Sequence, residues 1–236
     1  MGLLGGALFS FGGLLAVVVG QASLELPGAN PGLAALASGV VFPLGAVLAI
    51  LTGAHLYLDN CGLVTPAFLV GAVRSNELLR NWGLVYLGNF LGSAFVALFL
   101  AHWSGIVDVS AGGLGEVLGT AAAKMAEAKV SLPWRAAFLR GLGCGWLVCL
   151  AVWLAIASDG LAAKILAMWL PTMAFVVLGF EHSVANMFFV PLGILNGAKV
   201  TIGDFLLSNL LPVTLGNIVG GAGFVGVIYW WLYSRD

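Results

Sequence analysis

The sequence predicts an all-α integral membrane protein, and three observations lead to this fold class. Hydrophobic residues make up 61% of the 236 residues, whereas only 8% are charged, against about 25% in soluble proteins. The mean hydropathy is +1.08. Long apolar segments recur along the whole chain, and the second half repeats polar positions of the first half. We therefore expect six membrane spans arranged as two related halves.

Six apolar segments are candidates for the spans, because a helix needs about 20 apolar residues to cross the hydrocarbon core. The second and fifth segments are too long for one straight helix, since the second alone would extend about 60 Å, twice the thickness of the core. Both must therefore break or turn back inside the membrane. In chain order, the segments comprise residues 2–20, 33–73, 82–103, 136–157, 165–196 and 208–233.

The connections between the spans are short, except for residues 104–134. Within this connection, the stretch GEVLGTAAAKMAEAK predicts a short surface helix that ends before Pro133. No Lys or Arg precedes residues 2–20, which favours a first span over a secretory signal peptide. Basic residues near the span ends are divided almost evenly between the two sides, so charge alone does not orient the chain.

The two long segments carry similar polar stretches at their centres. GAHLYLDN, residues 53–60, aligns with GFEHSVAN, residues 179–186, at an offset of 126 residues. The third and sixth segments repeat as VYLGNFLGSAF and VTLGNIVGGAGF, in which Asn89 and Asn217 are separated by 128. Glycine-rich membrane helices can repeat one such spacing by chance, but two matches at nearly one offset favour an internal repeat.

The repeat predicts a single transmembrane domain with two inverted copies. The copies cover about residues 1–103 and 136–233, and residues 104–135 link them. Three spans in each copy place the copies in opposite membrane orientations. Two broken helices then face each other near the midplane, where irregular backbone is tolerated because it lines a cavity instead of lipid. This arrangement is typical of channels and transporters.

Five longer stretches resemble the signature blocks of the formate/nitrite transporter family. They are GVVFPLGAVLAILTGAHLYLDN, NWGLVYLGNFLGS, RGLGCGWLVCLAVW, WLPTMAFVVLGFEHSVANMFFVPLGI and LLPVTLGNIVGG. The resemblance extends from about Leu4 to Tyr233. It implies an aquaporin-like fold with interrupted second and fifth spans, a ring of five protomers with one pore each, and cytoplasmic termini. For a prokaryotic chain it further implies the cytoplasmic (inner) membrane.

Members of this family pass small monovalent anions of weak acids. The resemblance therefore implies a channel or transporter, not an enzyme, and no cofactor. Formate is the first candidate substrate, and nitrite and hydrosulfide are the alternatives. The expected partners are this anion, the lipid bilayer and further copies of the chain in a homopentamer. A net charge of −1 and the lack of a basic cluster disfavour nucleic acid as a partner.

His182 matches the pore histidine of the family. A bare anion at the centre of a low-dielectric pore pays a desolvation penalty of several kcal/mol, whereas the neutral acid pays little. An imidazole gives and regains a proton near neutral pH, so His182 is expected to relay a proton to the anion. The alternative is a buried histidine that hydrogen bonds hold in place for packing.

The resemblance assigns roles to further residues. Lys164 is expected to draw anions into the vestibule by its electrostatic potential. Phe42 and Phe175 are expected to form an aromatic constriction that excludes hydrated ions. Glu181 is expected to hold the loop beside the pore. The remaining pore candidates are Tyr57, Leu58, His55 and Val148, and the remaining structural candidates are Asn186, Asp59, Asn60, Asn89 and Asn217, with Asp59 as a cap of its half-helix.

The chain also departs from the family pattern. Leu58 replaces a threonine near the pore histidine, Gly145 replaces an asparagine, and Met1 stands almost inside the first span, where the family has a preceding basic helix. These departures put the usual hydrogen-bond relay, the gating and the substrate in doubt. His55 is a candidate to share a proton with Glu181, and Tyr57 is a candidate to supply the missing hydroxyl.

Two other classes of protein use similar residues. A membrane haem protein would use His55 and His182 as axial ligands, and a metal transporter would add Asp59 and Glu181. Haem absorbance or metal in the purified protein would distinguish these classes from an anion channel.

Overall fold

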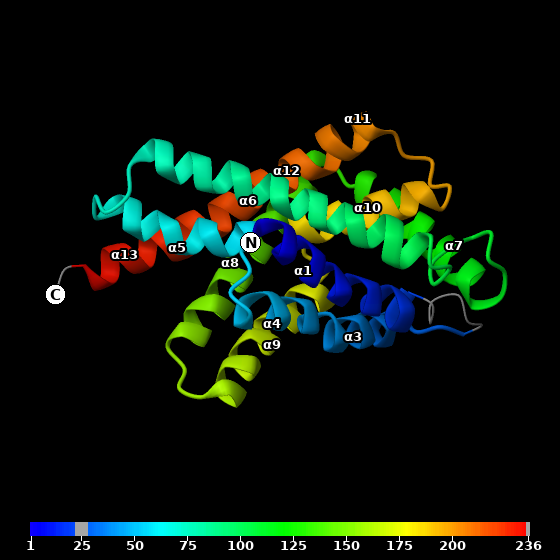
Figure 1. The fold of residues 1–236 in the computed structure, drawn as a ribbon, viewed down its shortest axis with the longest axis horizontal. Helices are drawn as coiled ribbons and strands as arrows, with labels where there is room; N and C mark the ends of the chain where they lie inside the picture. Colours follow the sequence, from blue (N-terminus) through cyan, green and yellow to red (C-terminus); the bar gives the residue numbers. More distant parts are fainter. Residues whose placement is uncertain (22–27, 235–236) are drawn as a thin grey trace.

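The computed structural model describes residues 1–21 and 28–234, and within these ranges the chain is helical and contains no β-strand (Figure 1). Five helices are long and apolar enough to cross a membrane, and the sixth crossing consists of the shorter apolar helices Leu161–Val177 (α9) and Ser183–Leu195 (α10). Large hydrophobic side chains are exposed along these helices, as contact with lipid requires. The predicted all-α integral membrane fold is confirmed.

The first half of the chain makes three crossings. The first is α1 (Gly2–Ala16), which continues into the π-helical turns of η1 (Val17–Gln21). The second comprises α3 (Pro31–Val41), α4 (Pro43–Leu51) and, after a break, α5 (Tyr57–Leu69). The third is α6 (Ser75–Phe95), which continues into η2 (Val96–His102).

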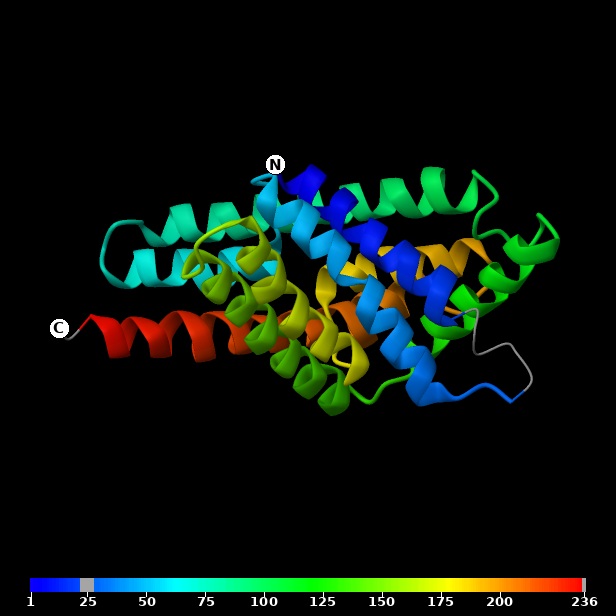
Figure 2. The ribbon, with the colours of Figure 1, turned by 90° about the horizontal axis from the view of Figure 1, so that it is seen from below.

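The second half repeats this plan after the connecting helix α7 (Gly113–Val130). It contains α8 (Trp134–Ile156), then α9, a break and α10. The last crossing is one continuous helix made of α11 (Ile202–Asp204), η3 (Phe205–Leu210), α12 (Leu211–Ile218), η4 (Val219–Val227) and α13 (Ile228–Tyr233). Figures 1 and 2 show that α6 and the stretch from α12 to α13 both follow the long axis of the molecule.

The third and sixth helices begin earlier than the sequence predicts, at Ser75 and Ile202. Their polar first turns are helical because side chains at the turn supply hydrogen bonds to the backbone. The Glu77 carboxylate accepts hydrogen bonds from the Arg74 amide at 2.9 Å and from the Arg74 guanidinium at 2.8 Å. The Thr201 hydroxyl accepts a hydrogen bond from the Asp204 amide. Hydropathy alone places these turns outside the spans.

Both long apolar segments are interrupted, as the sequence predicts. The chain leaves the helical conformation between α4 and α5 and again between α9 and α10. Gly53 has a φ of 75° and Gly179 a φ of 67°, a conformation that a side chain would strain. The two breaks therefore have the same backbone turn at the same repeat offset.

Equivalent asparagines of the third and sixth crossings hold the two breaks. Asn89 Oδ1 accepts a hydrogen bond from the Tyr57 amide at 2.8 Å, and its Nδ2 donates to the His55 carbonyl at 2.8 Å. Asn217 makes the same two bonds, each 2.9 Å long, across the break before α10. The first amide of each half-helix, which no helix can pair internally, is thereby satisfied.

One hydrogen bond joins equivalent positions of the two halves. The Tyr86 and Thr214 hydroxyl oxygens are 2.8 Å apart and lie 128 residues apart in sequence, the same separation as Asn89 and Asn217. A contact between equivalent residues of two related copies lies on the two-fold axis that relates them. The pseudo-two-fold axis therefore passes between α6 and α12.

The helix predicted in the connection between the halves is present and ends before Pro133, but one of its faces is buried instead of lying on the surface. Helix α7 packs on α10 and buries Leu118, Ala122 and Ala126, which are spaced four apart on one face. Figures 1 and 2 place α7 at the end of the molecule opposite the C-terminus. The many alanines let α7 approach α10 closely, and the helix thereby carries Lys129 to the functional region.

Small residues bring α8 and α12 into backbone contact. A Cβ added at Gly145 would lie 2.3 Å from the Asn217 carbonyl oxygen, and one added at Gly216 would lie 2.1 Å from the Phe138 carbonyl oxygen. Close approach at small residues is a common mode of helix packing in membranes. The family resemblance leads one to expect asparagine at position 145. With this backbone, no side chain fits there.

Substitution of Gly145 by alanine is expected to lower the free energy of unfolding by about 2 kcal/mol, because overpacking forces the two helices apart. The matched control is Gly223→Ala, since a Cβ at Gly223 meets no atom of the described residues within 4 Å. Denaturation by SDS in detergent micelles measures both variants. Equal stability of the two variants would show that α8 and α12 separate at no cost.

Candidate functional site

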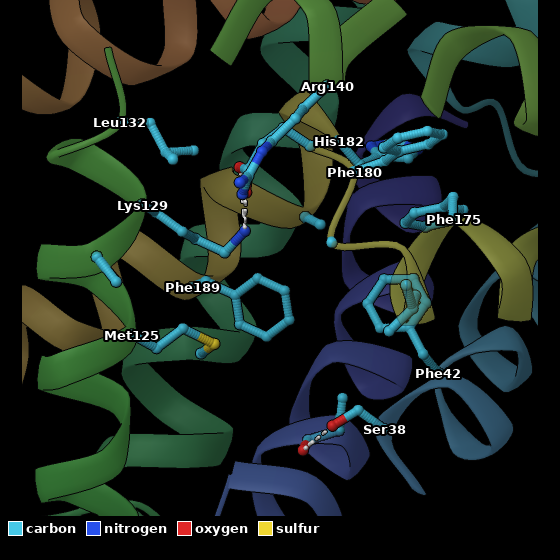
Figure 3. Close-up of a pocket in the computed structure, with 16 residues that line it drawn as sticks. Ser38, Phe42, Met125, Lys129, Leu132, Arg140, Phe175, Phe180, His182 and Phe189 are labelled. Carbon is cyan, nitrogen blue, oxygen red and sulfur yellow. Dashed lines mark hydrogen bonds and ion pairs between the residues drawn. The ribbon is translucent and has the colours of Figure 1, made fainter. Parts of the chain in front are cut away.

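A cavity of about 370 Å³ opens at the end of the molecule where α7 lies, and we call this opening the α7 mouth. Its walls come from α1, α3, α7, α8, α9 and α10, so both halves of the chain and the connecting helix contribute. Figure 3 shows its labelled side chains, with Lys129 and Arg140 on one wall and Phe42 and Phe175 on the other. The cavity reaches the break before α10.

His182 lies at the inner part of this cavity and is 1% exposed. It occupies the position before the first residue of α10, where Nδ1 accepts a hydrogen bond from the Val184 amide at 3.1 Å. A neutral imidazole that accepts at Nδ1 carries its hydrogen on Nε2. Among the described residues, Nε2 has no hydrogen-bond partner. The ring is thus fixed with a free N–H donor.

Aromatic rings surround His182. The ring centroids of Phe9 and Phe175 lie 4.5 Å and 5.8 Å from the imidazole centroid. Phe42 packs edge-on against both phenyl rings, at 5.1 Å from Phe9 and 5.6 Å from Phe175. Phe42 and Phe175 are 1% and 2% exposed, so they leave little free space beside the histidine. The wall next to the imidazole is therefore apolar, and a charged ligand there would lack hydration.

Glu181 is held by a buried polar network. Its carboxylate oxygens lie 2.9 Å and 3.0 Å from Lys129 Nζ, and Oε2 also accepts a hydrogen bond from Asn186 Nδ2 at 2.7 Å. Asn186 Nδ2 donates in addition to Asn209 Oδ1, and Asn209 Nδ2 donates to the Lys129 carbonyl. The network ties α7, α10 and η3 to the break, so Glu181 lies where a loop-holding residue is expected.

Lys129 and Arg140 are the cationic side chains of the cavity, and the sequence analysis selected neither of them. Lys129 is neutralised by Glu181, whereas Arg140 is exposed and has no acidic partner within 4 Å among the described residues. The four-residue spacing of Leu118, Ala122 and Ala126 is a signal that could have placed α7 in the core and Lys129 near the pore.

Lys164 does not line this cavity. It lies half-buried near the start of α9, and at about 1.5 Å per residue it is about 17 Å along the helix from Phe175. At the α7 mouth, therefore, Arg140 and not Lys164 lines the cavity, and the expected role of Lys164 in drawing anions into a vestibule stays a prediction.

The expected proton-sharing pair of His55 and Glu181 is not formed. The His55 side chain is exposed, whereas the Glu181 carboxylate is 4% exposed and is bound by Lys129 and Asn186. The repeat alignment correctly relates the two backbone positions, but the inverted arrangement directs the two side chains to different surroundings.

For α5, the expectation for Tyr57 stays a prediction and the expectation for Asp59 is wrong. The Tyr57 ring packs on Trp82 and Tyr86 of α6, with centroids 6.2 Å and 4.8 Å away, and among the described residues it makes no ring contact with His182. Asp59 is not a helix cap, because the amide of Tyr57 is bonded by Asn89, and the Asp59 Oδ1 atom has no partner among the described residues.

The other candidates of the first half are buried in the helix packing. Leu58 is 0% exposed, and its carbonyl accepts a hydrogen bond from Cys149 Sγ at 3.1 Å. Val148 of the second half precedes Cys149 on α8 and is 4% exposed. Asn60 Nδ2 donates to Asn81 Oδ1 at 2.7 Å. Among the described residues, no three His, Cys, Asp or Glu side chains are placed to hold a metal ion.

Comparisons with known proteins agree over almost the whole chain. The family model described as "Formate/nitrite transporter" matches residues 1–231. The chain is similar to a probable formate transporter of Methanothermobacter thermautotrophicus, with 47% identity over all of this chain and 88% of the relative. It is also similar to the formate channel BtFdhC of Bacillus thuringiensis, with 37% identity over all of this chain and 86% of the relative.

Solved structures give the same result. One structure described as an FNT family ion channel superposes with a TM-score of 0.85 and 32% identity, over 98% of this chain and 88% of that one. A pentameric formate channel with formate bound superposes with a TM-score of 0.82 and 32% identity, over 99% of this chain and 95% of that one.

Proposed function

The chain belongs to the formate/nitrite transporter family, and from this premise we propose that each protomer conducts formate across a membrane through its own pore. The observation that carries the proposal is the Nε2–H of His182, which has no hydrogen-bond partner among the described residues and lies between the rings of Phe9 and Phe175 at the inner part of the cavity. A donor that the protein leaves free at such a place is available to an anion. The naming of similar proteins as formate channels supports formate as this anion.

The proposed route begins at the α7 mouth. Arg140 raises the local concentration of anions there, because its charge is not cancelled by a carboxylate as that of Lys129 is. Phe42 and Phe175 then strip water from the anion, since a hydrated ion does not fit between large apolar side chains.

His182 receives the dehydrated anion by donating a hydrogen bond from Nε2. This bond compensates part of the desolvation penalty that an anion pays in an apolar pore. Transfer of a whole proton from the ring requires more, because Nδ1 accepts the Val184 amide and carries no hydrogen in this geometry. A neutral imidazole that gave up its only N–H proton would become an imidazolate, so the ring must first gain a proton from water at Nδ1. The proposed relay therefore includes a turn of the imidazole that releases the Val184 amide, so that Nδ1 takes up this proton before the Nε2 proton passes to the anion.

We also propose the assembly and the location. A pentameric formate channel is among the solved structures to which the chain is similar, which supports a ring of five protomers. The resemblance in sequence supports a prokaryotic cytoplasmic membrane with the C-terminus on the cytoplasmic side, and thus the α7 mouth on the outside.

Internal pH in sealed proteoliposomes after a jump in external formate tests the proposed function. Entry of formate with a proton acidifies the interior, and we expect faster acidification with the protein than in empty liposomes, which neutral formic acid enters by diffusion. The formate content of the same vesicles is measured alongside. Formate uptake without acidification would show that the anion crosses alone. No uptake of formate would contradict the proposal, and the same measurement with nitrite and hydrosulfide tests the two alternative substrates.

The Arg140→Gln variant is expected to reduce formate uptake several-fold at low ionic strength and to approach the wild type at about 1 M salt, because salt screens an exposed charge. Arg135→Gln is the matched control, since Arg135 is also exposed on α8 but does not line the cavity. Uptake is measured from internal pH at both salt concentrations. A loss of uptake that salt does not change would contradict the electrostatic role.

A further inference from the structure

Helix α5 carries a carboxyl group that the proposed route does not use. Asp59 is 5% exposed, and among the described residues its Oδ1 atom has no hydrogen-bond partner. Nearly all buried polar groups in proteins are paired, so an unpaired carboxyl group requires a reason. Helix capping is not the reason, because Asn89 already binds the first amide of α5.

The internal repeat gives the position of Asp59 relative to the pore. Asp59 is equivalent to Ala185 at the offset of 126 residues, and Ala185 lines the cavity of the α7 mouth. Lys164 is equivalent to Ser38, which lines the same cavity. Because the two halves are inverted, the repeat relates Asp59 and Lys164 to pore-lining positions on the side of the molecule opposite the α7 mouth.

The packing of α5 agrees with this position. Gly62 faces Cys149 of α8, and Thr65 faces η4. Asn60 faces α6, where it binds Asn81. At about 100° per residue, these contacts occupy the sides of α5 toward α6, α8 and η4 and leave Asp59 on the remaining side.

The surroundings of Asp59 hold no partner that would neutralise its charge. Within 4 Å, no cation of the described residues pairs with it. Its charge interacts with Cys61 of α5 and Cys149 of α8, and the exposed His55 lies four residues before it in the chain. Helices η4 and α12, which also pack on α5, carry no titratable side chain. The other titratable residues of α5, α6 and α8 are Tyr57, Glu77, Arg80, Tyr86, Arg135, Arg140 and Cys144.

We propose that Asp59 is a charge filter at the mouth opposite α7: its carboxyl group must be protonated for a weak-acid anion to pass. An ionised carboxylate in a narrow passage repels a second anion strongly, because little water screens the two charges. A protonated carboxyl group does not repel it and offers an O–H donor. This inference rests on the proposed function and adds the residue that selects by protonation state.

The two mouths would then differ in the charged groups that an anion meets. The α7 mouth presents the unpaired cation Arg140, whereas the opposite mouth presents Lys164 at its rim and a carboxyl group deeper inside. Flux through the protein therefore depends on the pH of the compartment that Asp59 faces, in addition to the amount of neutral acid in solution.

The test compares initial formate uptake by wild-type and Asp59→Asn proteoliposomes between about pH 5 and about pH 8 on the side that Asp59 faces. Uptake by the variant is divided by uptake by the wild type at each pH. Both proteins meet the same concentration of formic acid, so its change with pH does not affect this ratio. We expect a ratio near one at the acidic end and about tenfold or more at the alkaline end, because asparagine cannot ionise. Asp159→Asn, which removes an exposed carboxylate before α9, is the control and should give a ratio of one throughout.

Three results would overturn the proposal or its premise. A ratio that does not change with pH would show that Asp59 is not a filter. Loss of the wild-type elution volume in both Asp59→Asn and Asp59→Ala, the latter matching Ala185, would show that the residue serves folding instead. An absence of uptake in the wild type itself would contradict the proposed function, and the inference would fail with it.

Discussion

Replacement of His182 by phenylalanine is expected to reduce formate uptake at neutral pH by about 100-fold or more, because the pore then offers no polar donor at its most apolar point. Phenylalanine keeps a flat ring beside Phe9 and Phe175 but is larger and offers no acceptor for the Val184 amide, so an unchanged elution volume must accompany the loss of uptake. Uptake is measured as initial acidification of proteoliposomes after a formate jump.

A second variant separates the two roles of the imidazole. His182→Asn keeps an N–H donor but does not titrate near neutral pH. If the proton relay operates, this variant should take up formate with a pH dependence that lacks the histidine step. The matched control is His102→Gln, since His102 lies outside the cavity beside Asp108. Unchanged uptake by His182→Phe would remove His182 from the pathway altogether.

Lys129→Met is expected to destabilise the protein by about 3 to 5 kcal/mol, because it leaves the buried Glu181 carboxylate without its cation. Glu181→Gln leaves a lysine that is only 16% exposed without its anion and should cost a similar amount. The double variant removes both charges and should be more stable than either single variant. Thermal unfolding of the purified oligomer measures all three.

The stability of the double variant relative to the two single variants measures the coupling between Lys129 and Glu181. A coupling of several kcal/mol in this double-mutant cycle would identify the pair as the tie between α7 and the break before α10. Additive losses would show instead that the two residues act independently. Lys199→Met, which removes an exposed lysine that does not line the cavity, controls for the loss of one lysine.

The sequence predicts the breaks and His182 for a physical reason. An acid and an imidazole stand at the centre of an apolar run that is too long for one helix, and lipid does not tolerate them. The repeat then relates Asn89 to Asn217, and the structure places both at the breaks with the same hydrogen bonds.

Other parts of the site depend on packing that one sequence does not reveal. The stretch that ends at Lys129 has the composition of a solvated helix, and only its alanine face indicates burial. The repeat relates His55 to Glu181 correctly, yet it does not predict that Lys129 from outside the repeat neutralises one of them. Asp59 is a residue type that often caps helices, but it lies about one turn inside α5. The first amide of α5 is bonded by Asn89 instead.

The hydrogen bond between Tyr86 and Thr214 has a bearing on the ancestry of the chain. If a gene duplication produced the two halves, this position once contacted its own copy in a dimer of half-length chains. Any substitution there appeared on both sides of the contact at once, so only residues complementary to themselves were tolerated. Fusion into one chain removed that constraint, and a large and a small hydroxyl residue now share the space that two identical residues had to divide equally.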